Sequence, residues 1–208
     1  MHRNKEQENH KQWQQHIEKD IAKAQQRIEQ EIGQSHKLFA YPYGEYNSAL
    51  AQIVNKMGYT AFGQQSGAVG EQSDFLAIPR FPFSGSYTAL EDFALKVMTL
   101  PLPVKKTKAM ENPLPYKNDQ PELTLELSSD GLFTQSLSNL QCFASYQGKI
   151  DIELTSSNHL MIRPSQNIPV GRSRYNCTSS ITHQQQQRFY WFSHPWIRLD
   201  KNNQWILD

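Results

Sequence analysis

The stretch from Leu38 to Tyr46 reads Leu-Phe-Ala-Tyr-Pro-Tyr-Gly-Glu-Tyr, and the first half of the chain is arranged around it. An apolar, aromatic run is interrupted by Pro42, which fixes φ and has no amide proton, and by Gly44, which permits backbone angles that other residues avoid. The pattern predicts a strand that ends in a tight turn. Because sites in α/β folds form where strands end, this turn is either an ordinary strand end or the edge of a site.

Helices are expected on both sides of this stretch. Residues 9–32 form one amphipathic helix, and Gly33 is a natural stop for it. Asn47 or Ser48 begins a second helix, which Gly58 ends. The apolar residues of the first helix recur at spacings of three and four and make one stripe: Trp13, Ile17, Ile21, Ala24, Ile28 and Ile32.

Strands are expected to alternate with these helices. A loop rich in glycine covers residues 63–75, and Thr88 with Glu91 forms a capping box for a third helix that runs through Leu100. This alternation is typical of an α/β fold with a parallel sheet or barrel. The predicted strands are residues 37–41, 59–62 and 76–80.

The second half of the chain has a different pattern. Pro101–Pro121 is rich in proline and lysine and predicts a linker. Apolar and polar residues then alternate or form short runs, which predicts an antiparallel β domain, a small β-sandwich. These runs are residues 123–127, 150–154, 160–163 and 189–192. The expected domains are residues 1–104, a linker over 105–121, and residues 122–208.

Composition excludes several classes of protein. The 208 residues include 21 Lys and Arg and 20 Asp and Glu, and a net charge of +1 gives no field for nucleic acid. No apolar run is long enough for a membrane span, and the N-terminus lacks the apolar segment of a signal peptide. Cys142 and Cys177 are either a free buried pair or, in an oxidising compartment, a disulfide.

In their order, the long helix, Tyr41-Pro42-Tyr43-Gly44, the segment Gly58–Gly63 and Ile78–Pro82 resemble the later part of the polysaccharide deacetylase (NodB-homology, carbohydrate esterase) domain, over residues 7–100. The resemblance implies a partial (β/α) barrel of that type. It also implies metal-dependent hydrolysis of N-acetyl groups on an amino-sugar polymer. The expected cofactor is zinc or a similar divalent metal, the expected partner is an N-acetylated polysaccharide or oligosaccharide, and the expected location is periplasmic or extracellular.

The resemblance also assigns roles to residues of the turn. The backbone N–H of Tyr43 is expected to donate to the oxyanion, while Tyr41 and Pro42 shape the wall that binds substrate. Ala40 stands where the family often has an arginine that holds the catalytic carboxylate. Arg80 either reaches the same place from a neighbouring strand or forms a surface salt bridge, and the sequence leaves both open.

The metal and base motifs of the family lie before the long helix and are not found in this sequence. His10 and His16 do not replace them, because a separation of six residues places them about 120° apart around a helix. No metal ligand is therefore assigned, and the chain alone is expected to be inactive. The alternatives are a non-catalytic carbohydrate-binding or accessory protein and a structural interaction module.

Aromatic residues are frequent in the second half of the chain. Their faces can stack on sugars, or they can fill the core of the β domain, and the sequence does not decide between these roles. They are Tyr146, Tyr175, Tyr190, Trp191, Trp196 and Trp205.

Overall fold

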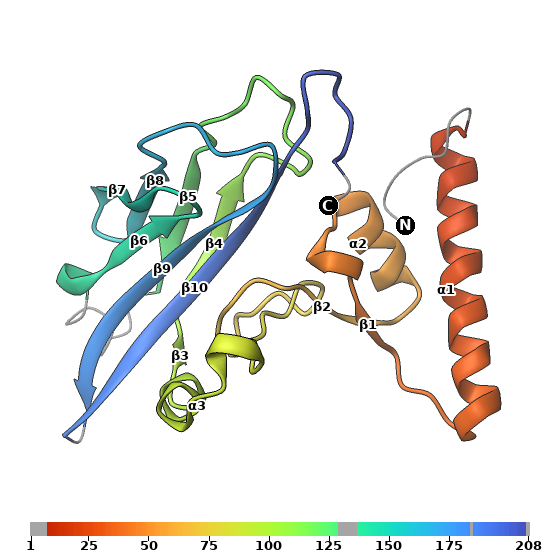
Figure 1. Ribbon diagram of the computed structural model, residues 1–208, viewed down its shortest axis with the longest axis horizontal. Helices are drawn as coiled ribbons and strands as arrows, with labels where there is room; N and C mark the ends of the chain where they lie inside the picture. Colours follow the sequence, from red (N-terminus) through yellow and green to blue (C-terminus); the bar gives the residue numbers. More distant parts are fainter. Residues whose placement is uncertain (1–7, 129–136, 184, 207–208) are drawn as a thin grey trace. The chain divides into compact units, whose positions relative to one another are not determined.

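The computed structural model describes residues 8–128, 137–183 and 185–206. The chain forms two compact units, coloured along the sequence in Figure 1. Unit 1 comprises residues 1–64 with 74–78, and unit 2 comprises residues 65–73 with 79–208. This division of the chain lies earlier than the domain boundary expected at residue 104.

Unit 1 begins with helix α1, His10–Ile32. Asn9 caps it, because the Asn9 side chain accepts from the amide of Gln12 (2.9 Å) and the Gln12 side chain accepts from the amide of Asn9 (3.0 Å). Gly33 ends the helix in the left-handed conformation, with φ 75°. The bounds agree with the periodicity of the sequence. The buried residues of the helix are Trp13, Ile17 and Ile21.

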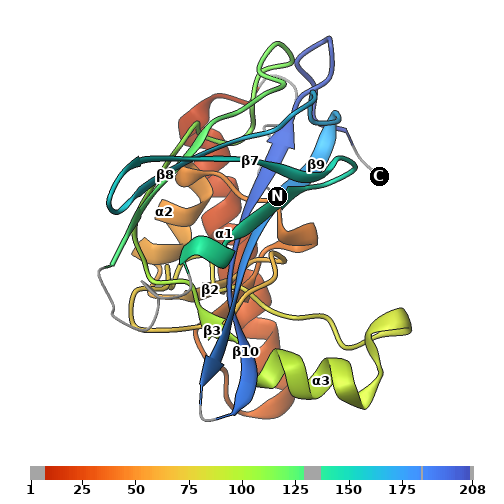
Figure 2. The ribbon, with the colours of Figure 1, turned by 90° about the vertical axis from the view of Figure 1, so that its left-hand side faces the viewer.

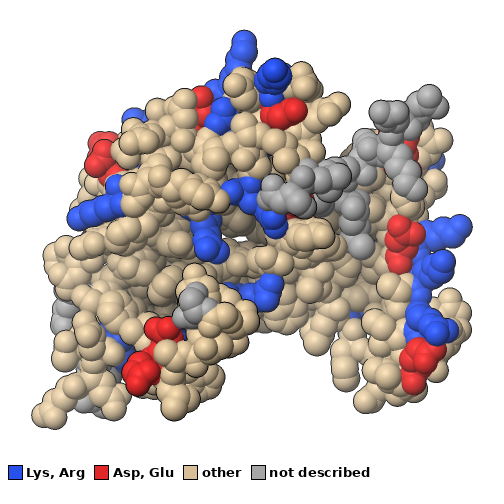
Figure 3. All heavy atoms as spheres, in the orientation of Figure 1, with Lys and Arg blue, Asp and Glu red and all other residues tan. Residues whose placement is uncertain are grey.

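The apolar stripe of α1 is buried only along its first half. Ala24 is exposed, and Ile28 and Ile32 are 48% and 66% exposed. On the other faces, basic and acidic side chains are interspersed along the helix (Figure 3), and one ion pair joins Arg27 to Glu31 at 2.5 Å. The apolar stripe that the sequence predicts is therefore covered only over the first turns of the helix.

The rest of unit 1 is a parallel βαβ arrangement. Strand β1, Leu38–Ala40, pairs in parallel with β2, Thr60–Phe62, and helix α2, Ser48–Lys56, connects them. The side chain of Asn47 caps α2 by accepting from the amide of Leu50 (2.9 Å). The core of this unit contains Trp13, Ile17, Ile21, Tyr41, Leu50, Ile53, Val54, Tyr59 and Ala61.

A third parallel segment is present only as an isolated bridge. The strand expected over residues 76–80 is reduced to the pairing of Ile78 with Phe62. The amide of Ile78 donates to the carbonyl of Ala61 (2.8 Å), and the amide of Gly63 donates to the carbonyl of Ile78 (3.0 Å). Both backbone polar groups of Ile78 face β2, so the missing amide proton of Pro79 removes a donor from the opposite edge of this segment, where a further strand would pair.

Helix α3 of unit 2, Leu90–Val97, is shorter than expected. Its N-cap is Ala89, which forms no side-chain cap, and Leu100 belongs to a strand instead of to the helix. The predicted capping box is wrong because Thr88 ends a preceding 3-10 turn and its hydroxyl donates backward to the carbonyl of Gly85 (3.1 Å).

Unit 2 is built on one eight-stranded sheet in the order β3-β10-β9-β6-β7-β8-β5-β4. All neighbouring strands are antiparallel except β3 and β10, and the long β9–β10 pair runs the length of the sheet (Figure 2). The strands are β3 (Leu100–Pro101), β4 (Val104–Ala109), β5 (Leu123–Leu127), β6 (Gln141–Ala144), β7 (Gly148–Ser156), β8 (His159–Arg163), β9 (Gly171–His183) and β10 (Gln186–Arg198).

The sheet curls into a half-barrel because one segment forms both of its edges. The amide of Leu102 donates to the carbonyl of Trp191 on β10 (3.1 Å), and the carbonyl of Pro103 accepts from the amide of Ser128, just after β5 (2.7 Å). The two edge strands, β3 and β4, follow each other in the chain and are separated only by Leu102 and Pro103. The ladder is continuous from one edge to the other, and the predicted β-sandwich is not confirmed.

The core of unit 2 lies on the inner face of this sheet. A disulfide joins Cys142 on β6 to Cys177 on β9, which are opposite each other in the register and both 0% exposed. Of the two possibilities that the sequence left open for these cysteines, the structure has the disulfide. Around it lie apolar side chains that include Leu123, Leu125, Ile150, Ile162, Tyr175, Tyr190 and Trp196.

Candidate functional site

The candidate site lies where the parallel segments of unit 1 end. Strand β1 runs into Tyr41, whose amide donates to the carbonyl of Phe62 (3.0 Å), and β2 runs into Gly63. The carboxyl ends of parallel strands meet at one edge of a sheet, and ligands of α/β proteins bind at that edge. The turn after β1 and the loop after β2 therefore share the edge at which a site is expected.

The turn itself has an unusual backbone. Pro42–Gly44 forms a 3-10 turn in which Tyr43 has φ 58° and ψ 11°. The amide of Gly44 donates to the carbonyl of Tyr41 (2.8 Å), and the amide of Glu45 donates to the carbonyl of Pro42 (3.1 Å). A left-handed conformation is costly for an aromatic residue, and residues held in strained conformations cluster at functional sites. The conformation of Tyr43 therefore supports a functional role for this turn.

Gly44 holds the turn against the loop that follows β2. It has φ +69°, and a Cβ atom at this position would lie 2.6 Å from Cβ of Gln64 and 2.9 Å from the amide nitrogen of Gln64. No other residue fits that space without a shift of the backbone. The close approach keeps the two loops of the edge together.

Tyr41 forms the buried base of the turn and is 2% exposed. Its ring stacks on Tyr46 at 4.6 Å and meets the edge of Phe39 at 5.4 Å. Burial, together with the charges of Tyr46 and Asp74, raises the pKa of Tyr41 above its ordinary value. Its hydroxyl, which forms no hydrogen bond with any residue that the structure describes, therefore stays protonated and able to donate.

Two acidic residues of this region were not singled out by the sequence. Glu45 is only 7% exposed. Asp74 lies close enough to Tyr46 to raise the pKa of that phenol, an effect second to burial. The only sequence signal for Glu45 is that it follows Gly44 directly. No local signal identifies Asp74, because it comes close to Tyr46 only through the fold.

The predicted site residues are distributed over both units. Tyr43 is 63% exposed in unit 1, beside buried Tyr41 and exposed Pro42. Arg80 belongs to unit 2, where it is exposed and its amide donates to the carbonyl of Gln65 (2.9 Å). The shared role of Tyr43 and Arg80 stays a prediction.

The described residues do not fit a metal ion. Within residues 8–128, 137–183 and 185–206, no group of three or more His, Cys, Asp or Glu residues could hold one. His10 stacks on Trp13 with ring centroids 5.5 Å apart, and His16 contacts Asp20 at 3.0 Å. In the same part of the chain, no helix has the length and apolar character required to cross a membrane.

The aromatic residues of the β domain divide between the core and the surface. Trp196 and Tyr175 are 0% exposed and pack edge to face at 5.5 Å, and Tyr190 is also buried. Trp191 is partly exposed, and Tyr146 is 87% exposed in the turn between β6 and β7. Core packing accounts for three of the six, and the other three, Trp191, Trp205 and Tyr146, keep part of their surface exposed.

The chain is similar to one known family. The model of the polysaccharide deacetylase family matches residues 2–62, which end with strand β2 and include the turn at Tyr41–Gly44. This match supports the resemblance read from the residues of the turn, whereas the resemblance of residues 63–100 stays a prediction. No curated protein and no solved structure matches the chain.

Proposed function

We propose that this chain is part of a metal-dependent polysaccharide deacetylase, which hydrolyses N-acetyl groups on an amino-sugar polymer. The observation that carries the proposal is that the matched residues, 2–62, end at the carboxyl edge where the turn at Tyr41–Gly44 lies. The left-handed Tyr43 in that turn adds support, because strained residues concentrate at active sites.

The turn suits the stabilisation of negative charge. When water adds to the acetyl carbon, the carbonyl oxygen becomes an oxyanion, and a fixed backbone N–H is an effective donor to it. In this proposal the donor is the N–H of Tyr43, and Tyr41 with Pro42 forms the wall beside the acetyl group. Arg80 has the proposed role of orienting the catalytic carboxylate. A rigid turn needs no rearrangement as the charge develops.

The divalent metal belongs to the proposal through the family, and the described residues of this chain supply no site for it. The 208-residue chain alone is therefore expected to release no acetate from N-acetylated chitooligosaccharides in the presence of zinc or cobalt. Acetate release above the buffer control, abolished by a chelator, would contradict this expectation of an inactive chain.

A test of the turn itself is the ¹H–¹⁵N resonance of the Tyr43 amide. We expect this resonance to move on titration with N-acetylated chitooligosaccharides and to stay in place with the fully de-N-acetylated oligomers, which are the matched control. An amide that responds equally to both ligands, or to neither in a folded chain, would overturn the role of Tyr43.

A periplasmic or extracellular location is also part of the proposal. The disulfide between Cys142 and Cys177 supports it, since such bonds persist in oxidising compartments.

A non-catalytic carbohydrate-binding protein is the second candidate function. The observation that favours it is a groove on unit 2, lined in part by aromatic side chains.

A further inference from the structure

A groove of about 320 Å³ lies on the outer face of the sheet of unit 2. Strand register explains why these side chains meet. Phe143 of β6 is opposite Asn176 of β9, and Thr178 of β9 is opposite Trp191 of β10, so alternate residues of three neighbouring strands project to one side. The side chains that line the groove are Leu95, Phe143, Asn176, Thr178, Phe189 and Trp191.

Aromatic side chains are unexpected on this face. An antiparallel sheet with one face on a core usually presents polar residues on the other. The inner face already holds Cys142 and Cys177, yet the outer face carries Phe143, Phe189 and Trp191. The core therefore does not account for these three aromatic rings.

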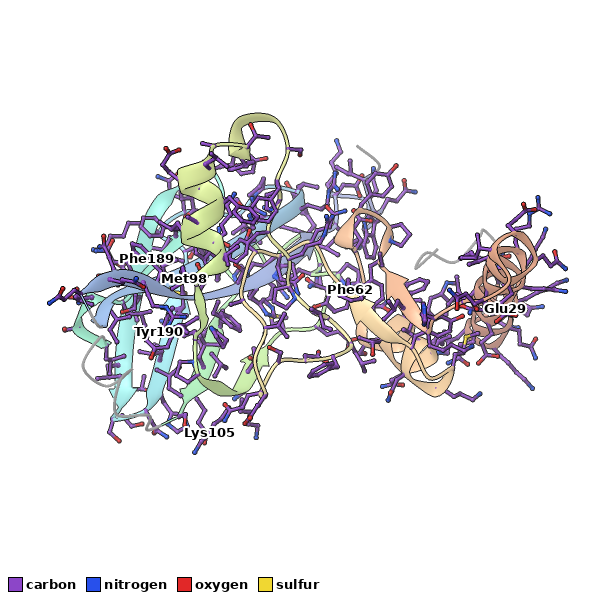
Figure 4. The ribbon with its side chains drawn as sticks, turned by 90° about the horizontal axis from the view of Figure 1, so that it is seen from below. Glu29, Phe62, Met98, Lys105, Phe189 and Tyr190 are labelled. Carbon is purple, nitrogen blue, oxygen red and sulfur yellow. A yellow bond between two sulfur atoms is a disulfide. The ribbon has the colours of Figure 1, made fainter. Side chains whose placement is uncertain are left out.

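Helix α3 forms one wall of the groove through Leu95. The guanidinium Nε of Arg188 donates to the carbonyl of Met98 (2.8 Å) and so ties the end of the helix to β10. Figure 4 labels Met98 at this end of the helix and Phe189 and Tyr190 on β10. The wall is thus attached to the floor by a hydrogen bond.

A chain of hydrogen bonds fixes the floor. The indole Nε1 of Trp191 donates to the hydroxyl of Ser193 (3.1 Å), and that hydroxyl donates to Oδ1 of Asn176 (2.6 Å). The rings of Trp191 and Phe81 also pack in a T-shaped arrangement, with centroids 5.3 Å apart. Because Oδ1 of Asn176 is the acceptor here, its NH₂ group is the part of the amide that can donate to a ligand.

We propose that this groove binds a neutral sugar ring of a polysaccharide. A pyranose has an apolar C–H face, which suits the Trp191 indole, and hydroxyl or acetamido groups, which suit Asn176 and Thr178. No lining residue is charged, which disfavours phosphorylated and acidic ligands. Its volume is at the lower end of the range of roughly 300–1,000 Å³ for ligand pockets, so the groove holds a short stretch of a polymer.

The choice of an N-acetylated sugar as the ligand rests on the proposed function. The proposal of a sugar-binding groove rests on the residues that line it. The test is titration of the full chain with chitotetraose, followed by tryptophan fluorescence and calorimetry. We expect saturable binding that Trp191→Ala weakens by at least about tenfold and Asn176→Ala by about tenfold, the loss typical of one hydrogen bond or stacking contact. Trp191→Phe should retain part of the affinity.

The matched control is Tyr146→Ala, which removes an exposed aromatic ring outside the groove and should leave the affinity unchanged. Titration with cellotetraose separates the sugar-binding groove from the proposed function. A chain that binds cellotetraose but not chitotetraose would support a sugar-binding groove and would count against an N-acetylated polymer as the substrate of the deacetylase. A folded Trp191→Ala variant that binds chitotetraose with wild-type affinity would overturn the proposal that the groove binds a sugar ring. So would binding of palmitate in place of both oligosaccharides, or no saturable binding of either.

Discussion

Gly44 shows how one residue can fix the geometry of the candidate site. Its φ of +69° and its contact with Gln64 both exclude a side chain, whereas at Gly58, with φ +78°, an added methyl group would have nothing within 4 Å. Gly44→Ala should lower the free energy of unfolding by about 2 kcal/mol or more, because backbone strain and overpacking add. Gly58→Ala should cost only about 1 kcal/mol, for strain alone.

Urea denaturation of both variants measures this difference. Equal losses at the two positions would show that Gln64 moves aside easily and that the turn is less tightly held against its neighbouring loop.

His194 makes stability depend on pH. Part of the residue reaches solvent, but its Nε2 is buried without a hydrogen bond among the described residues, and the ring lies 4.4 Å from Trp196. Burial lowers the pKa of His194 to about 4, below the ordinary value of 6.5. Between these values the unfolded chain binds a proton that the folded chain does not, so stability should fall as the pH decreases from 6.5 to 4.

Thermal unfolding of the wild type and of His194→Gln over this pH range is the measurement. The variant should lose the part of the pH dependence that His194 supplies. Parallel curves for the two proteins would mean that the imidazole is solvated and titrates normally.

At the scale of elements, the sequence was most informative where side chains repeat without interruption. The stripe of α1 with its terminal Gly33 and the alternation of β5 identify those elements directly. Strand β9 was not predicted, because Ser173 and Ser179 occupy buried positions on either side of Tyr175 and Cys177 and disguise the apolar alternation. A serine at a buried position breaks the alternation of apolar and polar residues from which a strand is predicted.

Strand β4 was hidden by charge. It falls largely within residues 105–121, where a linker was expected, and three of its six residues are lysines. Lys105, labelled in Figure 4, is exposed on this strand, which is the last in the strand order. Lysines on an edge strand prevent pairing with other chains, so the features that suggested a linker are those of a protected edge.

Helix α1 offers a matched pair of isoleucines for a stability test. Ile17 is 1% exposed in the core of unit 1, whereas Ile28, on the same stripe, is 48% exposed. Ile17→Ala should cost about 2–5 kcal/mol, since it leaves a cavity. Ile28→Ala should cost much less. Chemical denaturation compares them, and a similar loss for both would indicate that the second half of the stripe is covered in solution.

At the scale of the whole molecule, the disulfide is expected to stabilise one unit only. Cys142 and Cys177 are 35 residues apart, and closing a loop of that length stabilises the folded state by about 3–4 kcal/mol in the chain-entropy view. The double variant Cys142→Ala, Cys177→Ala should therefore lower the stability of unit 2. Hydrogen exchange followed by mass spectrometry reports on each unit separately. If α1 of unit 1 loses as much protection from hydrogen exchange as the strands of unit 2, the two units unfold together.

The candidate site was predictable only in outline. Pro42 and Gly44 reveal a turn after a strand, and the match over residues 2–62 agrees with that interpretation. The left-handed backbone of Tyr43 and the nearness of Asp74 to Tyr46 depend on packing between segments distant in the sequence. Such features have no local pattern, because they arise from the tertiary fold and not from the propensities of neighbouring residues.

The joint at Leu102 and Pro103 has a consequence for biosynthesis. Strand β3 pairs only with β10 within the described sheet, where Leu100 is opposite Tyr190. As the ribosome releases the chain, β3 must wait unpaired until β10 has emerged. The half-barrel therefore closes only after β10 has been synthesised, and chains that stall before β10 leave an open strand edge for chaperones to protect.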